Sequence, residues 1–368
     1  VYTGSAEQTP DPTMEAIEGE GLVPAYRGTA YVVMEDLALE PFGNRVPQFS
    51  FEVIRAEQPG TPEFDTDLAQ IVGGVALMPG TGEYALATTP VYYSGGPGSR
   101  LTANVNSPSG LSDFQTSMEA LGEELPACDS VSLVVSWFGN DLRCGSCQLV
   151  PKVEQKTYEG SNMPWSVAGE TRATAGLMAE DEGRPIYGGT PADASVVEAI
   201  RHMNAAGQRV MFYPFVLMDQ QAGNGLTDPW TGTDDQPHLP WRGRITLSVA
   251  PGQAGSPDGT AAADAEVAAF FGTATAADFT VGDGVVSYAG PAEWGLRRFI
   301  LHYAALCAAA GGVDAFCIGS EFRGLTQIMG AAGFPAVQAM RDLAAEVRAL
   351  LGPGARIGYA ADWSEYFG

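Results

Sequence analysis

Glu321 is the acidic residue with the clearest chemical context in this chain of 368 residues. It lies in Cys317-Ile-Gly-Ser-Glu-Phe-Arg323, directly after a short apolar run that is typical of a buried strand. A carboxyl group partly removed from water has a raised pKa and can donate a proton near neutral pH, as the general acid of a glycosidase does. A salt bridge to Arg323 or to a neighbouring strand is the alternative interpretation. We therefore treat Glu321 as a candidate catalytic residue.

Glycoside hydrolysis by a carboxyl pair needs a second carboxyl group about 5 to 9 Å from the first. Four acidic residues near predicted strand ends qualify, and no spacing singles one out: Asp141, Asp219, Asp362 and Glu365. Aromatic residues at these ends could stack on sugar rings, although single aromatic residues more often fill a core. The residues predicted to bind substrate around Glu321 are Trp137, Asp141, Tyr213, Asp219, Arg323, Asp362 and Trp363.

Other chemistries have weaker support in the sequence. Cys144-Gly-Ser-Cys147 has C-x-x-C spacing, but no second Cys or His pair accompanies it, which favours loop thiols or a local disulfide over a metal site. The three histidines, His202, His238 and His302, are scattered. No G-x-S-x-G, G-x-G-x-x-G or P-loop pattern follows a predicted strand. We expect no metal and no cofactor.

The elements that would position these residues alternate between strand and helix. Helices are predicted at 111–125, from Thr190, from about Pro291 and at 334–351. Short apolar runs predict strands at 131–137, 165–168, 209–217, 313–319 and 355–361. This alternation predicts an α/β fold with a parallel sheet, and polar and aromatic residues at the strand ends favour a TIM barrel over a doubly wound sheet. Because about five strands are found and a barrel needs about eight, we expect a partial barrel that continues beyond Gly368.

The N-terminal third has a different pattern. Residues 1–21 are polar and are predicted to be a linker or tail. Residues 28–39 and 48–55 are predicted to be strands, and residues 57–110 are expected to be irregular β structure and connections. The predicted domains are 1–21, a β-rich region at 22–110, and a TIM-barrel-like domain at 111–368.

Composition excludes several classes of protein. The chain has 19 Lys and Arg against 44 Asp and Glu, a net charge of −25, which disfavours binding to nucleic-acid phosphates. A hydrophobic content of 45% is enough for a packed core. No apolar run reaches the length of a transmembrane helix, and residues 1–21 lack a signal-peptide pattern. The chain starts without Met, which suggests part of a longer protein, and five cysteines exclude a disulfide scaffold.

Two sets of segments resemble known proteins. Residues 23–39, Phe42-Gly-Asn-Arg-Val-Pro-Gln48 and Phe51-Glu-Val53 resemble the hub and tip proteins of long-tailed phages and phage-like gene transfer agents. A second set resembles the TIM-barrel-like, glycoside-hydrolase-like domain in the large tail-tip protein of gene transfer agents: Tyr213-Pro-Phe-Val-Leu-Met-Asp219, Pro240-Trp-Arg-Gly-Arg244, Ile318-Gly-Ser-Glu-Phe-Arg-Gly-Leu325 and Tyr359-Ala-Ala-Asp-Trp363. The two sets occur in the expected order and together cover nearly the whole chain.

The resemblance implies a structural protein at the distal end of a tail tube, with a β-rich hub part that forms a trimer and a barrel that faces the cell envelope. In the related glycosidase clan the acid/base is a Glu that closes strand four, and Glu321 lies at a compatible position. The clan's nucleophile closes strand seven, which this sequence does not contain. Ser320 stands where the clan usually has an Asn that holds the sugar 2-hydroxyl, so the chain departs from the pattern there.

The resemblance also implies partners and a location. We expect a tail-tip component of a virion or phage-like particle, assembled in the bacterial cytoplasm, whose barrel binds or cleaves envelope or peptidoglycan glycan during attachment or penetration. Expected partners are other tail proteins (distal tail, hub, tape-measure or peptidase components), two further copies in a homotrimer, and the glycan. DNA is expected to pass through a negatively charged lumen without specific binding, and this segment is not expected to insert stably into a membrane. One alternative is an inactive barrel that serves as a spacer or receptor-binding module. A free soluble glycosidase is less favoured, because residues 23–55 would then lack a purpose.

Overall fold

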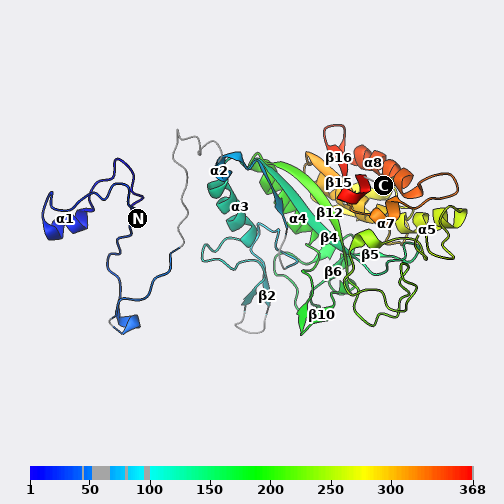
Figure 1. Cartoon of the computed structure of the whole chain (residues 1–368), viewed down its shortest axis with the longest axis horizontal. Helices are drawn as coiled ribbons and strands as arrows, with labels where there is room; N and C mark the ends of the chain where they lie inside the picture. The colour runs from blue at the N-terminus through cyan, green and yellow to red at the C-terminus, as the bar shows by residue number, and fades with distance from the viewer. Residues whose placement is uncertain (44, 52–66, 79–81, 95–99, 367–368) are drawn as a thin grey trace. The chain divides into compact units, whose positions relative to one another are not determined.

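The computed structural model describes residues 1–43, 45–51, 67–78, 82–94 and 100–366. The chain forms two compact units, Val1–Ala56 and Glu57–Gly368, and Figure 1 shows the elements of each. Within the described ranges, no helix has both the length and the apolar character needed to cross a membrane.

The first unit contains little regular structure. Helix α1 (Pro12–Glu18) is capped by the Asp11 side chain, and η1 (Glu40–Phe42) is a short 3-10 helix. The ring of Tyr2 stacks on that of Tyr31, with 4.5 Å between their centroids, and the two residues form an isolated antiparallel bridge. The prediction of strands at 28–39 and at the described residues 48–51 is therefore wrong, and residues 52–55 lie outside the described residues. Alternation of apolar residues makes a strand only where a partner strand is present to accept its hydrogen bonds.

The second unit is built on a parallel sheet. Its strands, in both spatial and chain order, are β1 (Gly74–Leu77), β4 (Ser130–Gly139), β12 (Arg209–Met218), β15 (Ala315–Ser320) and β16 (Arg356–Ala360). All four pairings are parallel, and β5 (Leu149–Val150) adds a short antiparallel strand to β4. Because the strand order follows the chain order without reversal, each connection advances in the same direction, as in a TIM barrel and unlike a doubly wound sheet. The α/β fold with a TIM-barrel-like domain is confirmed.

Helices connect the parallel strands and pack on one another, as Figure 1 shows for the segments around β12, β15 and β16. Helices α4, α6 and α8 form a continuous layer, since α6 contacts both of the others and all three contact strands of the sheet. The helices of this unit are α2 (Leu68–Ile71), α3 (Asp113–Glu124), α4 (Asp193–Ala205), α5 (Ala261–Phe271), α6 (Leu296–Ala309), α7 (Arg323–Thr326) and α8 (Pro335–Leu351), with 3-10 helices η3 (Arg242–Arg244), η4 (Ala276–Asp278) and η5 (Trp363–Tyr366).

Several short two-stranded sheets lie outside the parallel sheet. They pair β2 (Tyr92–Ser94) with β3 (Arg100–Thr102), β6 (Lys152–Val153) with β9 (Gly176–Leu177), β7 (Ser166–Val167) with β8 (Glu170–Thr171), β10 (Glu180–Asp181) with β11 (Arg184–Pro185), and β13 (Phe279–Val281) with β14 (Val286–Tyr288). The predicted barrel strand at 165–168 is therefore wrong, because β7 belongs to a local hairpin. The first parallel strand is instead β1, so the sheet begins before residue 111 and the predicted boundary at 110/111 falls inside this unit.

Side chains of the central strands alternate between the helix layer and the opposite face. Phe212 of β12 contacts Tyr303 of α6, with 5.2 Å between ring centroids, whereas Tyr213 and Phe215 point to the other face. Loop residues that follow β12 return over this second face, since the Arg242 guanidinium lies 3.8 Å from the Phe215 ring centroid. The face that would line a barrel is thus partly covered by the loop that carries η3.

Candidate functional site

Glu321 follows β15, the fourth parallel strand of the described sheet, and its backbone conformation is unusual. The pairing of β15 with β16 shifts register between Cys317 and Ser320, as at a β-bulge. Gly319 has a φ of 156° and Glu321 a φ of 52°, the latter in the left-handed region that non-glycine residues rarely occupy. The Glu321 amide still donates to the carbonyl of Ala360, at 2.9 Å. Bulges and left-handed residues at a strand end redirect side chains and often occur at functional sites.

Two neighbours hold the Glu321 carboxylate in one orientation. The indole Nε1 of Trp241 donates to Oε2 at 2.7 Å, and a guanidinium nitrogen of Arg242 lies 2.8 Å from the same oxygen. The Glu321 side chain is 36% exposed, so part of the carboxylate faces solvent. The alternative interpretation of Glu321, a salt bridge to Arg323 or to a neighbouring strand, is therefore met in part, because the carboxylate forms a salt bridge but its partner is Arg242 of η3.

Arg242 joins the loop to the strand ends. Its Nε donates to the Ser320 carbonyl at 2.9 Å and lies 3.1 Å from the Ser320 hydroxyl, while its guanidinium covers the Phe215 ring. The side chain is 6% exposed, and burial lowers the pKa of Arg242 while the Glu321 carboxylate opposes that shift. An arginine remains charged in any such environment, so this buried cation is a fixed counter-charge for Glu321.

Tyr213 belongs to the same cluster. It is on the face of β12 that Arg242 covers, and burial raises the pKa of Tyr213, an effect that its interaction with Ser320 partly offsets. Tyr213 therefore lies close to Ser320 and Glu321, and its predicted contact with substrate stays a prediction.

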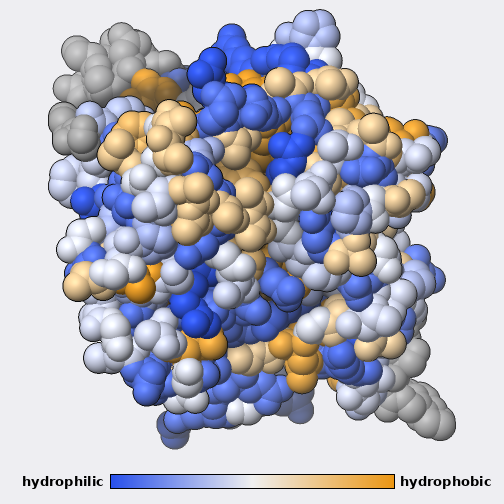
Figure 2. Space-filling view, turned by 90° about the vertical axis from the view of Figure 1, so that its right-hand side faces the viewer, coloured by the Kyte–Doolittle hydropathy of each residue, from blue (hydrophilic) through white to orange (hydrophobic). Residues whose placement is uncertain are grey.

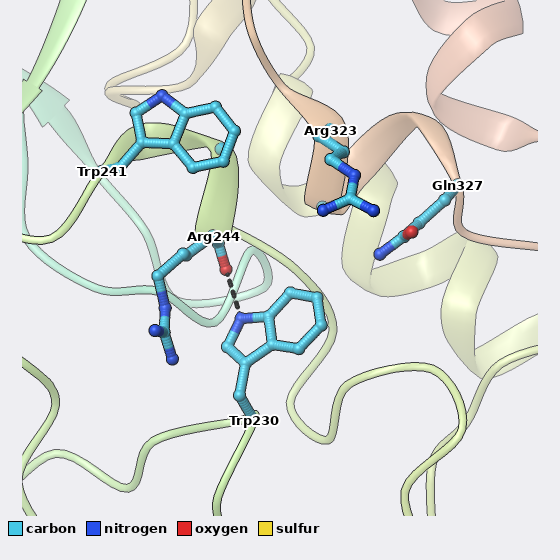
Figure 3. Close-up of a pocket in the computed structure, with 7 residues that line it drawn as sticks. Trp230, Trp241, Arg244, Arg323 and Gln327 are labelled. Carbon is cyan, nitrogen blue, oxygen red and sulfur yellow. Dashed lines mark hydrogen bonds between the residues drawn. The ribbon is translucent and has the colours of Figure 1, made fainter. Parts of the chain in front are cut away.

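A pocket with a volume of about 310 Å³ lies beside this cluster. Its lining comes from two segments, the loop after β12 and the α7 region after β15, and consists of Trp230, Trp241, Gly243, Arg244, Arg323, Gly324 and Gln327. Figure 3 shows the two indole rings on different sides of the pocket, with Arg323 and Gln327 across from them. The Trp230 indole donates to the Arg244 carbonyl at 2.8 Å, which fixes that ring. Trp241 links the pocket to Glu321, because its ring lines one and its N–H binds the other.

Two of the acidic residues predicted to bind substrate form buried ion pairs instead. Asp141 is 4% exposed and binds the Arg143 guanidinium at 2.7 Å and the Gln236 amide at 2.8 Å. The Asp219 side chain is 1% exposed and lies 2.5 Å from the Lys152 ammonium. Neither carboxylate faces the pocket beside Glu321, so the prediction of substrate contacts for Asp141 and Asp219 is not supported. Their contacts instead hold the loops after β4 and β12.

Trp137 is a core residue. Its side chain is completely buried, its indole donates to the Tyr303 hydroxyl at 3.0 Å, and its ring stacks on Phe299 with 4.8 Å between centroids. It faces the helix layer, where no sugar can reach it. The prediction that Trp137 binds substrate is therefore wrong, and the physical reason is strand alternation, which turns it towards α6.

Residues after β16 form a local cap. The Asp362 carboxylate accepts hydrogen bonds from the Ser364 hydroxyl and amide, which lower the pKa of Asp362. Glu365 accepts from the Tyr359 hydroxyl at 2.9 Å, the Thr326 hydroxyl at 2.7 Å and the Asp362 amide at 2.7 Å. Trp363 is 75% exposed and is not among the residues that line the pocket. Glu365 thus fastens η5 to α7.

The two cysteines of the C-x-x-C motif are free and buried. Burial raises the pKa of the Cys147 thiol to about 12 and raises that of Cys144 as well. Such thiols are unreactive at neutral pH. Across the described parts of the chain, no three His, Cys, Asp or Glu side chains converge as a metal site.

Sequence reasoning did not assign Trp230, Trp241, Arg242 or Gln327 to the site. The available signal was Pro240-Trp-Arg-Gly-Arg244, where an aromatic residue and two arginines occur together in a loop. Figure 2 shows the face that carries α7 and the C-terminal end, where hydrophilic residues are interspersed with smaller hydrophobic areas. A surface of this mixed character suits a polar ligand more than a large apolar partner.

Comparisons with known proteins give one family match and several distant structural matches. No curated protein matches the chain. Among solved structures, a complex of a GH113 beta-1,4-mannanase is 12% identical with a TM-score of 0.34, covering 68% of this chain and 50% of that one. The GH113 beta-mannanase AaManA from Alicyclobacillus acidocaldarius in complex with ManMIm is 17% identical with a TM-score of 0.34, covering 68% and 49%. A further GH113 beta-1,4-mannanase is 13% identical with a TM-score of 0.33, covering 69% and 51%. The chain spans about half the length of these structures.

The family match covers the part of the chain that contains Glu321. A family model described as the GTA TIM-barrel-like domain matches residues 294–368, which include α6, β15, α7, α8 and β16. Together with the parallel sheet in chain order, this match identifies a TIM-barrel-like domain in the second unit.

Proposed function

We propose that this chain is a tail-tip component of a phage-like particle and that its barrel binds or cleaves a glycan of the cell envelope. One observation carries the carbohydrate part of the proposal. The Glu321 carboxylate is held at the carboxyl end of β15 by Trp241 and Arg242, beside a pocket that contains two indole rings.

The chemistry of this arrangement suits a saccharide. Indole faces pack against the C–H faces of sugar rings, and a carboxylate accepts hydrogen bonds from sugar hydroxyls. A carboxyl group can also serve as the general acid of glycoside hydrolysis once a leaving oxygen lies within hydrogen-bond reach. The partial exposure of Glu321 leaves room for that approach.

The tail-tip part of the proposal rests on different features. The match to the GTA TIM-barrel-like domain supports it, as does the resemblance of residues 23–53 to tail hub proteins. The first unit also exposes many large apolar side chains, including Leu22, Met34, Phe42, Val46 and Phe51, which suits burial against other tail proteins or further copies in a trimer. Labelling of particle tails by an antibody to the chain, and trimer mass in solution, would test this part; labelling of heads only would contradict it.

A second candidate function is glycan binding without hydrolysis. Asp141 and Asp219 are buried in ion pairs, and Glu365 is occupied by three hydrogen bonds. Three of the four acidic residues considered as the second carboxylate are therefore engaged elsewhere. This observation favours an inactive barrel that acts as a spacer or receptor-binding module.

Binding and cleavage of isolated envelope glycan by the 368-residue chain test both functions. Glu321→Gln is compared with Glu119→Gln, an exposed residue of α3. Cleavage that is lost only in Glu321→Gln supports the enzyme, whereas binding without cleavage by the unaltered chain supports the second candidate. Cleavage unchanged in Glu321→Gln refutes the role of that residue, and absence of any glycan binding refutes the carbohydrate proposal.

A further inference from the structure

The pocket beside Glu321 contains a cation that is available to a ligand. Arg323 begins α7 and its side chain is exposed. Among the described residues its guanidinium forms no direct hydrogen bond or ion pair, although its charge acts on the nearby Asp362 carboxylate and helps to lower the pKa of Asp362. Figure 3 shows this guanidinium directed into the space between Trp241 and Gln327. The site therefore presents a planar set of N–H donors without an acceptor.

The other pocket arginine is differently placed. Arg244 forms an ion pair with Asp228, at 3.3 Å, and Figure 3 shows its guanidinium directed away from Arg323. Its charge is largely balanced by that partner. Arg323 is thus the pocket-lining arginine without a direct ion-pair partner among the described residues, and Asp362 acts on it only through a longer-range interaction.

Gln327 and the indole rings supply complementary contacts. The Gln327 side chain points into the same space as the Arg323 guanidinium, and the Trp230 ring lies across from both (Figure 3). A guanidinium binds a carboxylate or phosphate through paired hydrogen bonds, while an amide binds hydroxyl or acyl groups. A cavity of about 310 Å³ is at the lower end of the range for small-molecule sites.

We propose that this pocket is a subsite for an acidic sugar, meaning a sugar ring that carries an anionic group. Arg323 binds the anionic group, Gln327 binds a neighbouring oxygen, and Trp230 or Trp241 packs on the ring. The inference rests on the proposed saccharide binding and names its substrate class. Because the chain has a net charge of −25, its long-range field repels anions, so selection of an acidic sugar must come from this local contact.

Calorimetric titration of the 368-residue chain with four probes tests the inference. The probes are a galacturonic acid trimer, the methyl ester of the same trimer, and galactose 1-phosphate compared with galactose. We expect the acidic trimer to bind more tightly than its ester, and Arg323→Gln to weaken the acidic trimer by about tenfold or more while changing the ester by less than about twofold. Tight binding of galactose 1-phosphate that Arg323→Gln removes would identify phosphate as the preferred anionic group.

Arg341→Gln is the matched control. Arg341 is an exposed residue of α8, so this substitution removes the same charge at a position outside the pocket. Its affinity for the acidic trimer should stay within about twofold of the unaltered chain. Equal affinity for acid and ester, no effect of Arg323→Gln, or no binding of any anionic probe overturns the inference. If envelope glycan still binds in that case, the proposed saccharide binding survives; if it does not bind either, both fail.

Discussion

Glycine at position 321 should give a more stable protein than alanine at the same position. The backbone φ of Glu321 is 52°, a conformation in which the Cβ of an L-residue crowds the following carbonyl oxygen. Glycine has no Cβ and adopts this conformation without strain. In regular structure the order is the reverse, because glycine loses more backbone entropy on folding than alanine does.

The size of the effect follows from two opposing terms. A left-handed conformation destabilises a non-glycine residue by about 1–2 kcal/mol. The greater backbone entropy that glycine loses on folding acts in the opposite direction and destabilises the glycine variant by about 0.5–1 kcal/mol. The contacts with Trp241 and Arg242 are lost equally in Glu321→Gly and Glu321→Ala, so they cancel in the comparison. We expect Glu321→Gly to exceed Glu321→Ala in free energy of unfolding by about 0.5–1 kcal/mol.

Urea unfolding followed by tryptophan fluorescence and circular dichroism measures this difference. The paired variants Glu119→Gly and Glu119→Ala, at an exposed position inside α3, should show the opposite order, with alanine more stable by about 1 kcal/mol. If alanine at 321 is as stable as glycine or more so, the residue does not have the left-handed conformation. The direction of its carboxylate, on which the proposed site depends, would then lose its support.

Three further predictions concern the surroundings of the site. Burial alone would raise the pKa of Asp141, but hydrogen bonds from Arg143 outweigh this effect and lower that pKa. The ionised Asp141 carboxylate should therefore stabilise the folded state above about pH 4, and this stabilisation should be lost at lower pH. Asp141→Asn should accordingly reduce the difference in urea midpoint between neutral and acidic solution. Gly324→Ala places a methyl group against the backbone carbonyl oxygen of Ile245, so we expect a loss of about 1–3 kcal/mol in urea unfolding and weaker saccharide binding, since α7 must move. Trp137→Ala should lose about 3–5 kcal/mol because its ring is fully buried, while the saccharide affinity of the remaining folded protein stays unchanged in titration; a selective loss of affinity would contradict its assignment to the core.

Much of the barrel could be predicted from local patterns. The run at 131–137 lies within β4 and the run at 209–217 within β12, because a strand covered on both faces needs a continuous apolar stretch. The α8 helix starts with Pro335 at its first position and ends before Gly352, as its sequence predicts. By contrast, β1 is short and half-exposed, with a burial pattern that alternates along Gly74–Leu77. It lies in the short apolar run at 71–78, within the region expected to be irregular β structure, so its place in the parallel sheet was not predicted.

The amino-acid sequence by itself determined where the apolar strands β4, β12, β15 and β16 and the helix α8 form, and that Glu321 follows β15, because these properties depend on residues near one another in the chain. It did not determine which face a strand residue occupies, so Trp137 and Tyr213 were treated alike although one faces α6 and the other faces the site. Nor did it reveal that Trp241, 80 residues before Glu321, binds that carboxylate. Only the tertiary structure decided these points, since contacts between distant segments depend on strand register and loop path, which no local pattern encodes.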